Sequence, residues 1–321
     1  MTSDTTTSNS DKPLVVILGP TAGGKTGLSL ELCQQLPGGG ECVIADSMQI
    51  YAGMDIGTAS PTAEEQAIAP HHLLDIVEPS TDGFSVADWC KASEDAITDI
   101  RGRNRWPIVV GGTNLYIRSL LEGVFDGPAA DSAIRQELET YTPEELRSKL
   151  EASDPSSAER IHPNDRRRTI RALEVLAITG KRLSEQQAEW GASITPRKDA
   201  QIVGLEWSPE AINRRINARV KMMMEHGFLN EVRALHERCT PGTQAKEAVG
   251  YRELALHIEG KCSLDDAVEQ IKIRSRRYAK QQRTWLRRFR AIPGALWLDA
   301  EEESSESLAK ITVAKIGHLG G

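Results

Sequence analysis

The chain has 321 residues, of which 39% are hydrophobic and 26% charged, with a formal net charge of −7 at pH 7. This is the composition of an ordinary globular protein with room for one large domain or two modest ones. No run of eighteen apolar residues occurs, so we expect no membrane span. Five cysteines without a C-x-x-C pair argue against a zinc-thiolate site and favour reduced thiols in a cytoplasmic protein.

Residues 1–12 form the first segment and are rich in Thr, Ser, Asn and Asp. They lack the basic start and the apolar centre of a secretory signal. We therefore predict a disordered tail for residues 1–12.

Short apolar runs then alternate with stretches of helical periodicity. The predicted helices between them include Thr26–Gln35 and Val86–Arg101, and the predicted strands are Leu14–Gly19, Cys42–Ala45, Leu73–Val77, Ile108–Gly111, Ile202–Trp207 and Leu296–Leu298. This alternation predicts an α/β fold, namely a parallel sheet of the P-loop type with helices on its faces.

The strand pattern stops between residues 127 and 196. Three helices are predicted there, at Ser132–Tyr141, Pro143–Ala152 and Asp165–Thr179, with breaks at Asp154-Pro155 and His162-Pro163. We predict an all-helical insertion domain at residues 127–196, within a catalytic core made of residues 13–126 and 197–321.

Two further helices are predicted near the C-terminus. The first begins at Ser208-Pro209 and stops at Gly227, and the second begins at Ser263, with Asp266 in a capping position, and ends before Pro293. On the second, a seam recurs every seven residues and is expected to face inward; it comprises Ile271, Tyr278 and Trp285, with Phe289 one turn later.

Positive charge is concentrated in two segments despite the negative total. Residues 272–290 carry nine Lys or Arg residues and no acid, and residues 160–182 carry seven positive against two negative. Because attraction to phosphate is local and screened within about 10 Å, a basic face on an acidic protein is compatible with a nucleic-acid partner. A solvated helix face is the alternative.

A phosphate-binding loop follows the first predicted strand. Residues 19–26, GPTAGGKT, match G-x-x-x-x-G-K-[ST] between a strand and a helix. In such a loop, backbone N–H groups and the helix N-terminus face phosphate oxygens, Lys25 adds a charge and Thr26 offers a hydroxyl to Mg²⁺. The sequence has neither the Asn-Lys-x-Asp motif of a GTPase nor the typical second motif of an ATP hydrolase.

Polar residues also follow two other strands. Asp46 ends the strand that we expect beside the phosphate-binding loop, where it could bind metal or accept a proton. Gly111-Gly112-Thr113 suggests close backbone approach to a ligand. A strand-end Asp capping a turn, and Thr113 as a plain helix N-cap, remain the alternatives.

Two further pairs of residues are candidates for the site. Arg215 and Arg219 lie one turn apart beside an apolar stripe and could neutralise a leaving phosphate, although a solvated helix edge is the more common role. His71 and His72 have no nearby partner set for metal or nucleophile chemistry, so a structural role is expected for both.

In combination these segments resemble the tRNA dimethylallyltransferase family, also called tRNA isopentenyltransferases. The matching pieces occur in the family's order; they are residues 19–26, 46–51, 53–59, 70–76, 110–116, 160–165, 171–174, 249–252 and 278–280 with Trp285. Ser275 and Gln281 stand where the family more often has Thr and Arg. The sequence shows no C-terminal zinc finger, so it is most similar to the bacterial type.

The resemblance implies an enzyme, a prenyltransferase of tRNA modification. It would transfer the dimethylallyl group from dimethylallyl diphosphate to the exocyclic N6 amine of the adenosine 3′-adjacent to the anticodon, in tRNAs that read codons beginning with U. Diphosphate would be released. The adenosine must leave its stack to reach the site.

The resemblance also implies roles for individual residues. Asp46 would be the general base, and Thr113 and Arg219 would stabilise the leaving diphosphate. The diphosphate would be held by Gly19, Thr21, Ala22, Gly23, Gly24, Lys25 and Thr26, and Thr26 would carry Mg²⁺. The residues at tRNA-contacting positions are Asp46, Ser47, Met48, Gln49, Thr113, Arg135, Asn164, Asp165, Arg166, Arg167, Arg168, Gly250, Tyr251 and Arg252, and the cations of 274–290 would follow backbone phosphates.

The expected partners are the tRNA anticodon stem-loop and dimethylallyl diphosphate, with no membrane, and the expected assembly is a monomer. Two other functions are open from the sequence: a small-molecule kinase that uses the loop for ATP, and a non-catalytic tRNA-binding protein that uses it as an anion anchor.

Overall fold

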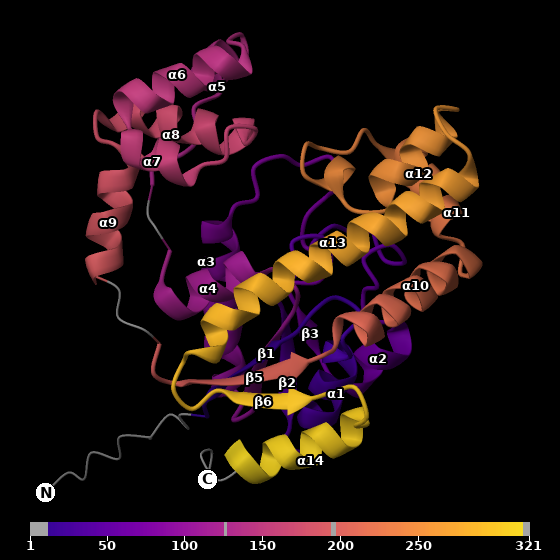
Figure 1. Ribbon diagram of the computed structural model, residues 1–321. Coiled ribbons are helices and arrows are strands. Elements are labelled where there is room, and N and C mark those ends of the chain that lie inside the picture. The colour runs from indigo at the N-terminus through magenta and orange to yellow at the C-terminus, as the bar shows by residue number, and fades with distance from the viewer. Residues whose placement is uncertain (1–11, 125–126, 194–196, 317–321) are drawn as a thin grey trace, which may run out of the picture. The chain divides into compact units, whose positions relative to one another are not determined.

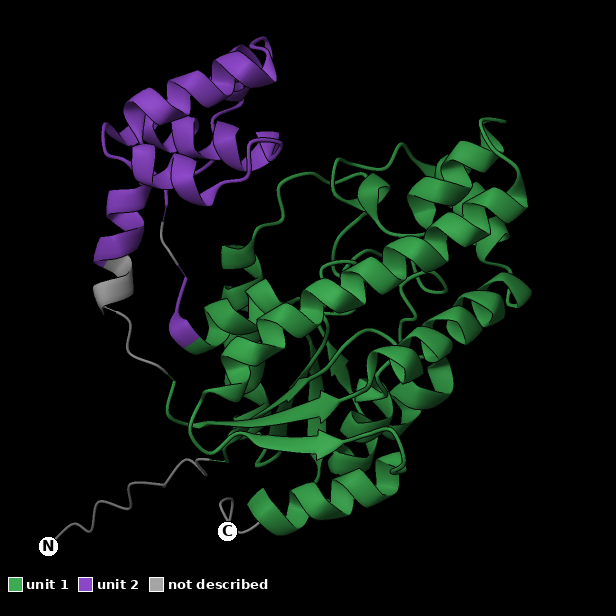
Figure 2. Cartoon of the chain, in the orientation of Figure 1, with its two compact units in different colours: residues 1–121, 197–321 green, residues 122–196 purple. Residues whose placement is uncertain are grey.

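The computed structural model describes residues 12–124, 127–193 and 197–316 (Figure 1). The predicted tail at residues 1–12 lies outside these ranges except for Lys12. By their internal contacts the residues separate into two compact units, 1–121 with 197–321 (unit 1) and 122–196 (unit 2), coloured separately in Figure 2. No helix among the described residues is long and apolar enough to cross a membrane.

Unit 1 contains a parallel sheet of six strands in the order β3-β2-β4-β1-β5-β6. The strands are β1 Leu14–Leu18, β2 Gly40–Ile44, β3 His71–His72, β4 Trp106–Val110, β5 Ala200–Glu206 and β6 Leu296–Asp299. Every residue of β1, β2 and β4 is buried, as expected for central strands covered on both faces. The expected α/β class with a parallel sheet is confirmed.

Helices cover both faces of this sheet. The helices of unit 1 are α1 Lys25–Gln35, α2 Ala63–Ile68, α3 Val86–Gly102, α4 Asn114–Glu122, α10 Pro209–Glu225, α11 Phe228–Arg238, α12 Tyr251–Ile258, α13 Leu264–Arg290 and α14 Ser305–Ile316, with a 3₁₀ turn at Ala245–Glu247. Of these, α11 and α12 pack against each other and against α10 and α13, not against the described strands of the sheet. The chain moves one way along the sheet from β1 to β2 and the other way from β3 to β4 and β5. Right-handed crossovers therefore place α1 on one face, with α14 against it, and α3, α4 and α13 on the other (Figure 1).

The reversal of chain direction falls between β1 and β4, which are direct neighbours in the sheet. In open α/β sheets, ligands bind beyond the carboxyl ends of the strands at such a switch point. Asp46 follows β2, and β2 is separated from β1 by β4, so our expectation that its strand lies next to the phosphate-binding loop is wrong. The loop after β4 instead stands between them.

The third strand also differs from expectation. The sheet pairs only at His71–His72, not along Leu73–Val77, although Val77 makes an isolated bridge to Tyr51. Leu73 and Asp75 have positive φ values of 65° and 54°. Because this left-handed backbone turns the chain out of an extended path, the apolar run cannot continue the strand.

Unit 2 is helical, with α5 Ser132–Glu139, α6 Pro143–Ser153, α7 Pro155–Arg160, α8 Arg166–Thr179 and α9 Leu183–Ser193. The predicted break at Asp154-Pro155 is present, since α6 ends at Ser153, but a further helix that was not predicted, α7, begins directly after it. The side chain of Asp154 accepts the Ser157 N–H, and Pro155 occupies the first turn, where its missing N–H costs nothing. Leu146, Leu150 and Val175 are among the residues of the unit's own core.

The ion cluster of unit 2 is centred on Glu174, whose side chain is 0% exposed. It accepts hydrogen bonds from Arg135, from Arg171 and from the N–H of Asp131. Burial acts to raise the pKa of Glu174, but the hydrogen bonds from Arg135 and Arg171 outweigh it, so the pKa lies below its ordinary value. The cluster ties α5 and its N-terminal turn to α8.

The predicted inward seam of α13 is only partly correct. Ile271 and Phe289 are 2% and 0% exposed, and Ala279, Gln282 and Leu286 are buried with them. Tyr278, in contrast, is 37% exposed because it lines a cavity. The buried stripe therefore includes one polar residue, Gln282, that the seven-residue seam did not contain.

Candidate active site

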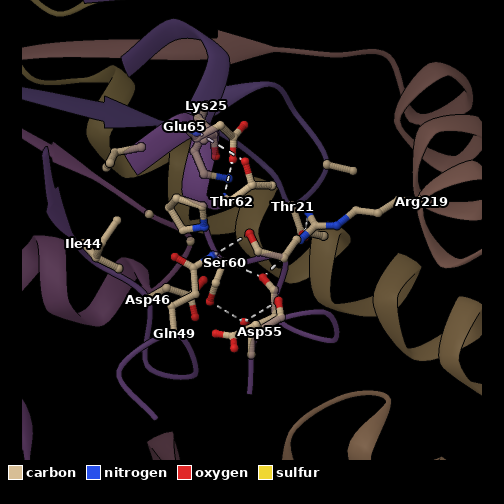
Figure 3. A pocket seen from close by; sticks show the side chains of 18 of the residues that line it. Thr21, Lys25, Ile44, Asp46, Gln49, Asp55, Ser60, Thr62, Glu65 and Arg219 are labelled. Atoms are coloured by element: carbon tan, nitrogen blue, oxygen red, sulfur yellow. Dashed lines mark hydrogen bonds between the residues drawn. The ribbon is translucent and has the colours of Figure 1, made fainter. Parts of the chain in front are cut away.

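A cavity of about 680 Å³, here the large cavity, opens at the carboxyl ends of β1, β2 and β4 (Figure 3). A second cavity of about 260 Å³, here the side cavity, shares part of its wall. The residues common to both are Thr21, Ala22, Asp46, Thr58, Arg219, Met223 and Tyr278. The side cavity adds apolar groups from α10, α11 and α13, including Ile216, Val220, Phe228 and Ile271.

Residues 21–26 of the phosphate-binding loop line the large cavity, whereas Gly19 lies behind it against Leu205. Gly24 has φ 82°, and a Cβ on Gly23 would stand 2.8 Å from the Pro20 carbonyl oxygen. Both positions therefore require glycine. The loop leads directly into α1, which starts at Lys25.

The carbonyl oxygens of this loop are held from its outer side. Trp207 Nε1 donates to Gly23 O at 3.1 Å, and Arg215 Nε donates to Ala22 O at 2.8 Å. The Arg215 guanidinium also stacks over the Trp207 ring at 4.6 Å. Arg215 is thus an exposed support for the loop, whereas Arg219, one turn later, enters the cavity.

Arg219 donates to the Thr58 carbonyl oxygen at 3.1 Å, and it meets the Thr21 hydroxyl at 3.4 Å. Figure 3 shows Arg219 directed toward Thr21. Desolvation by the enclosing protein lowers the pKa of Arg219, which the charge of Asp46 opposes. Desolvation, assisted by the charge of Arg219, lowers the pKa of Lys25 to about 8, and Lys25 Nζ donates to Pro20 O at 2.8 Å. Two cations therefore face one cavity, which suits a multiply charged anion.

Asp46 lies on the opposite wall, where its Oδ1 accepts the Met48 N–H at 2.9 Å. Desolvation raises the pKa of Asp46, and the Met48 N–H, Lys25 and Arg219 oppose this rise without cancelling it. A carboxylate with a raised pKa is a better proton acceptor at neutral pH than an ordinary one.

Thr113 does not line either cavity. Its hydroxyl accepts the Ser47 N–H at 2.9 Å and donates to Ser47 Oγ at 3.1 Å, so it fastens the loop after β4 to the loop after β2. A Cβ on Gly111 would stand 2.1 Å from Ala45 O. The two loops therefore touch through backbone at Gly111, which explains the glycine at that position.

The turn that faces Arg219 is held by a single carboxylate. Glu231 on α11 accepts the backbone N–H groups of residues 55, 56 and 57, and it also accepts the Tyr251 hydroxyl. Tyr251 is 2% exposed and packs edge-on against Phe228. The predicted tRNA contact at Tyr251 is thus a buried support, and Gly250, with φ 98°, lets the chain pass Phe228.

The other predicted tRNA residues occupy different settings. Ser47, Met48 and Asp46 line the side cavity, and Gln49 lines the large one and donates to Thr58 O. In unit 2, Asn164, Arg167 and Arg168 are exposed, Asp165 caps α8, and Arg166 donates to the Glu139 and Tyr141 carbonyls. Arg135 belongs to the ion cluster of unit 2, and Arg252 pairs with Glu247.

The basic segment of α13 is more neutralised than its sequence suggests. Lys272 and Arg276 pair with Glu269, Arg274 pairs with Glu253, and Arg290 pairs with Glu206. Arg277, Lys280 and Arg287 are exposed. All of these acids lie outside residues 272–290. Glu269 belongs to the first turns of α13, and Glu253 and Glu206 belong to α12 and β5, so a charge count within residues 272–290 does not include them.

His72 pairs with the buried Glu41, in line with the structural role expected for it, whereas His71 lines the large cavity and its Nε2 is buried without a hydrogen-bond partner among the described residues. His72 Nε2 lies 2.7 Å from Glu41 Oε2, and His71 Nδ1 lies 2.8 Å from the Ala69 carbonyl oxygen. Among the described residues, no group of three or more His, Cys, Asp or Glu side chains could hold a metal ion.

Known proteins that are similar to this chain belong to one family. The profile of the IPP transferase family matches residues 49–289. The tRNA dimethylallyltransferase of Shouchella clausii is 46% identical over 305 residues, covering 94% of each chain.

Solved structures give the same result. The tRNA delta(2)-isopentenylpyrophosphate transferase of Staphylococcus epidermidis is 40% identical, with a TM-score of 0.68, over 95% of this chain and 99% of that one. A eukaryotic dimethylallyltransferase described as acting on tRNA is 31% identical, with a TM-score of 0.79, over 94% of this chain and 78% of that one. This chain is therefore a member of the tRNA dimethylallyltransferase (IPP transferase) family, as its sequence motifs suggested.

Proposed function

We propose that this chain transfers the dimethylallyl group of dimethylallyl diphosphate to the N6 amine of the adenosine 3′-adjacent to the anticodon, in tRNAs that read codons beginning with U. The observation that supports it most is the shared wall of the two cavities. Asp46 and Arg219 face each other there, with the phosphate-binding loop on one side and an apolar cavity on the other.

The anion wall fits the diphosphate of the donor. Lys25, Arg219 and the backbone amides of the loop would bind its oxygens, and the side cavity offers apolar surface for the five-carbon chain. As the bond between C1 of the allyl group and the diphosphate oxygen breaks, negative charge builds on the leaving group. Fixed cations stabilise that charge without reorganisation, which is the largest catalytic effect such a site can supply.

Asp46 would act on the acceptor. An exocyclic aromatic amine is a weak nucleophile, so its N6–C1 bond forms as the amine loses a proton. The Asp46 carboxylate takes that proton, and diphosphate leaves with the electron pair of the broken C–O bond. Asp46 holds its Oδ1 toward Met48 N–H, which fixes the carboxylate for this transfer.

The residues present are suited to Mg²⁺. Thr26 lies at the start of α1 and Asp46 follows β2, and both residues line the large cavity, so the cavity presents the hard oxygen ligands that this ion prefers. Few protein ligands are needed, because Mg²⁺ commonly takes its remaining ligands from substrate phosphates and water. Bound there, the ion would add positive charge at the diphosphate.

tRNA would contact the loop after β2, the exposed cations of α8 in unit 2 and the exposed cations of α13. Arg167 and Arg168 are exposed on α8, and Arg277, Lys280 and Arg287 on α13. Such side chains neutralise backbone phosphates, and binding should weaken steeply as salt rises. We propose residues 127–196 as a tRNA-contacting domain and a monomeric enzyme.

The test is incubation of the purified protein with unmodified tRNA, Mg²⁺ and dimethylallyl diphosphate, followed by mass spectrometry of the digested nucleosides. We expect prenylated adenosine, and none from a matched tRNA carrying guanosine at that position. A parallel reaction with ATP in place of the prenyl donor tests the kinase alternative. Folded protein that binds tRNA but forms no prenylated adenosine would contradict the proposal and favour the non-catalytic alternative.

A further inference from the structure

Gln282 is the one residue on the buried stripe of α13 that is polar and 2% exposed. Its side-chain oxygen accepts the Thr21 N–H at 2.8 Å, and its side-chain nitrogen donates to the Gly112 carbonyl oxygen at 2.9 Å. One amide therefore bridges the phosphate-binding loop after β1 and the glycine loop after β4. These are the two loops at the switch point of the sheet.

Each of these loops leads to a group of the proposed reaction. Thr21 carries the hydroxyl that meets Arg219 at 3.4 Å. Gly112 lies next to Asp46, because a Cβ on Gly112 would stand 3.4 Å from Asp46 Oδ2 and only 2.7 Å from Gln282 Nε2. The Gln282 amide is thus the direct link between the wall that binds the anion and the wall that carries the base.

A second donor from the same helix supports the Gly112 contact. The Tyr278 hydroxyl reaches Gly112 O at 3.2 Å, and residues four apart on a helix project from the same face. The exposed side of α13 carries cations, including Arg277 and Arg287. One rigid helix therefore carries the polar bridge on its inner face and the proposed tRNA contacts on its outer face.

We propose that Gln282 is a positioning residue for the prenyl transfer, which fixes the separation between the diphosphate site and Asp46 by bonding Thr21 and Gly112 at once. This rests on the proposed function. Transfer requires the reacting carbon and the amine to be held within about 3–3.5 Å in the right direction, so a small shift of one loop against the other should slow the chemical step.

The first test replaces Gln282 with Met, which keeps the length of the side chain and removes both hydrogen bonds. The matched control is Gln270→Met, the same change at an exposed position of α13. Single-turnover rate, the KM for dimethylallyl diphosphate, the Kd for tRNA and the thermal midpoint are measured for both. For Gln282→Met we expect a rate loss on the order of tenfold or more, a raised donor KM and a tRNA Kd within about twofold of wild type.

Wild-type protein in the same assay separates this inference from the proposed function. If wild type forms no prenylated adenosine, the function fails. If wild type is active and Gln282→Met has a lowered thermal midpoint but an unchanged rate and donor KM, then Gln282 is merely structural and the inference is overturned.

Gln282→Glu gives a second readout that does not depend on packing. A protonated carboxyl has one donor and one acceptor, as the amide does, whereas a carboxylate cannot donate to the Gly112 carbonyl. The deficit of this variant relative to wild type should therefore shrink as pH falls and grow as pH rises. A deficit of the same size at every pH would overturn the assignment of the Gly112 bond.

Discussion

Two carboxylates organise the two units of this molecule, and they do so in opposite ways. Glu174 in unit 2 is 0% exposed, accepts hydrogen bonds from two arginines and one backbone N–H, and has a lowered pKa. Asp46 in unit 1 is partly exposed at a cavity wall, accepts a hydrogen bond from Met48 N–H, and has a raised pKa.

The difference shows that burial alone does not decide whether a carboxylate can take a proton. Burial raises the pKa of both groups, but direct hydrogen bonds to the charged form reverse the effect for Glu174. At Asp46 the hydrogen bond from Met48 N–H and the charges of Lys25 and Arg219 across the cavity lower the pKa too little to cancel the effect of burial. The pKa of Asp46 therefore stays above its ordinary value. A carboxylate with several hydrogen bonds from charged donors, such as Glu174, stays ionised and holds structure together. A carboxylate with fewer such bonds, such as Asp46, can accept a proton and is a candidate base.

The variant with the largest expected effect is Asp46→Asn, which tests whether Asp46 is the base. Asparagine keeps the shape of the side chain and the oxygen that accepts the Met48 N–H, but it cannot take a proton. We expect a loss of about 10²- to 10⁴-fold in the transfer rate, the usual range for a general base. The tRNA Kd, measured by filter binding, should change little.

Asp75→Asn is the matched comparison, because Asp75 lines the same cavity and desolvation, with the charge of Asp55, raises its pKa to about 6. A larger loss for Asp75→Asn than for Asp46→Asn would move the base to Asp75.

The pH profile of kcat/KM should be bell-shaped, with an acidic limb from Asp46 and an alkaline limb from Lys25. On each limb kcat/KM should change by about tenfold per pH unit. Because the base must be deprotonated, activity falls as pH decreases through the pKa of Asp46, which lies above its ordinary value. Because the cation must be protonated to bind diphosphate, activity also falls as pH rises past the Lys25 pKa of about 8. Lys25→Arg should remove the alkaline limb, and an unshifted limb in that variant would assign it to another group.

Glu174→Gln tests the structural side of the comparison and should have the smallest effect on catalysis. Losing the charge-assisted hydrogen bonds to Arg135 and Arg171 should lower the free energy of unfolding by about 1–3 kcal/mol. We expect the lower part of this range, because both arginines are partly exposed and can form hydrogen bonds with water instead. The wild-type contribution is present above the ordinary pKa of a glutamate and is lost as pH falls through the lowered one.

Hydrogen exchange across α8, read by mass spectrometry, should speed up in Glu174→Gln at neutral pH, whereas the transfer rate at saturating tRNA should match wild type. Unchanged exchange across α8 would mean that the cluster does not hold unit 2 together.

Much of the fold followed from local patterns. The phosphate-binding loop, most strand positions, the Ser208-Pro209 start of α10 and the Ser263 cap of α13 depend on neighbours within a few residues, and the structure has them where predicted. The strand expected at Leu73–Val77 failed because positive φ values at Leu73 and Asp75 are not encoded by hydrophobicity.

The surroundings of the site depended on long-range pairing that no local pattern contains. Gln282 meets Thr21 across 261 positions of sequence, and Glu231 meets the turn at residues 55–57 across more than 170. The only local signal for Gln282 was its place four residues after Tyr278 on one helix. The motif around Tyr251 predicts a tRNA contact, whereas the burial of Tyr251 arises from Phe228 and Glu231, which lie 20 or more residues away in the sequence.

The supports behind the phosphate-binding loop have a consequence for its selectivity. In a trans peptide the C=O and the following N–H point in opposite directions, so holding Gly23 O against Trp207 directs the Gly24 N–H away from it. A flip of this peptide plane would present an oxygen where an anion is expected, and the Trp207 bond opposes that flip. The loop is therefore preorganised. The orientation of its peptide groups already favours a negatively charged ligand, before the charge of Lys25 contributes.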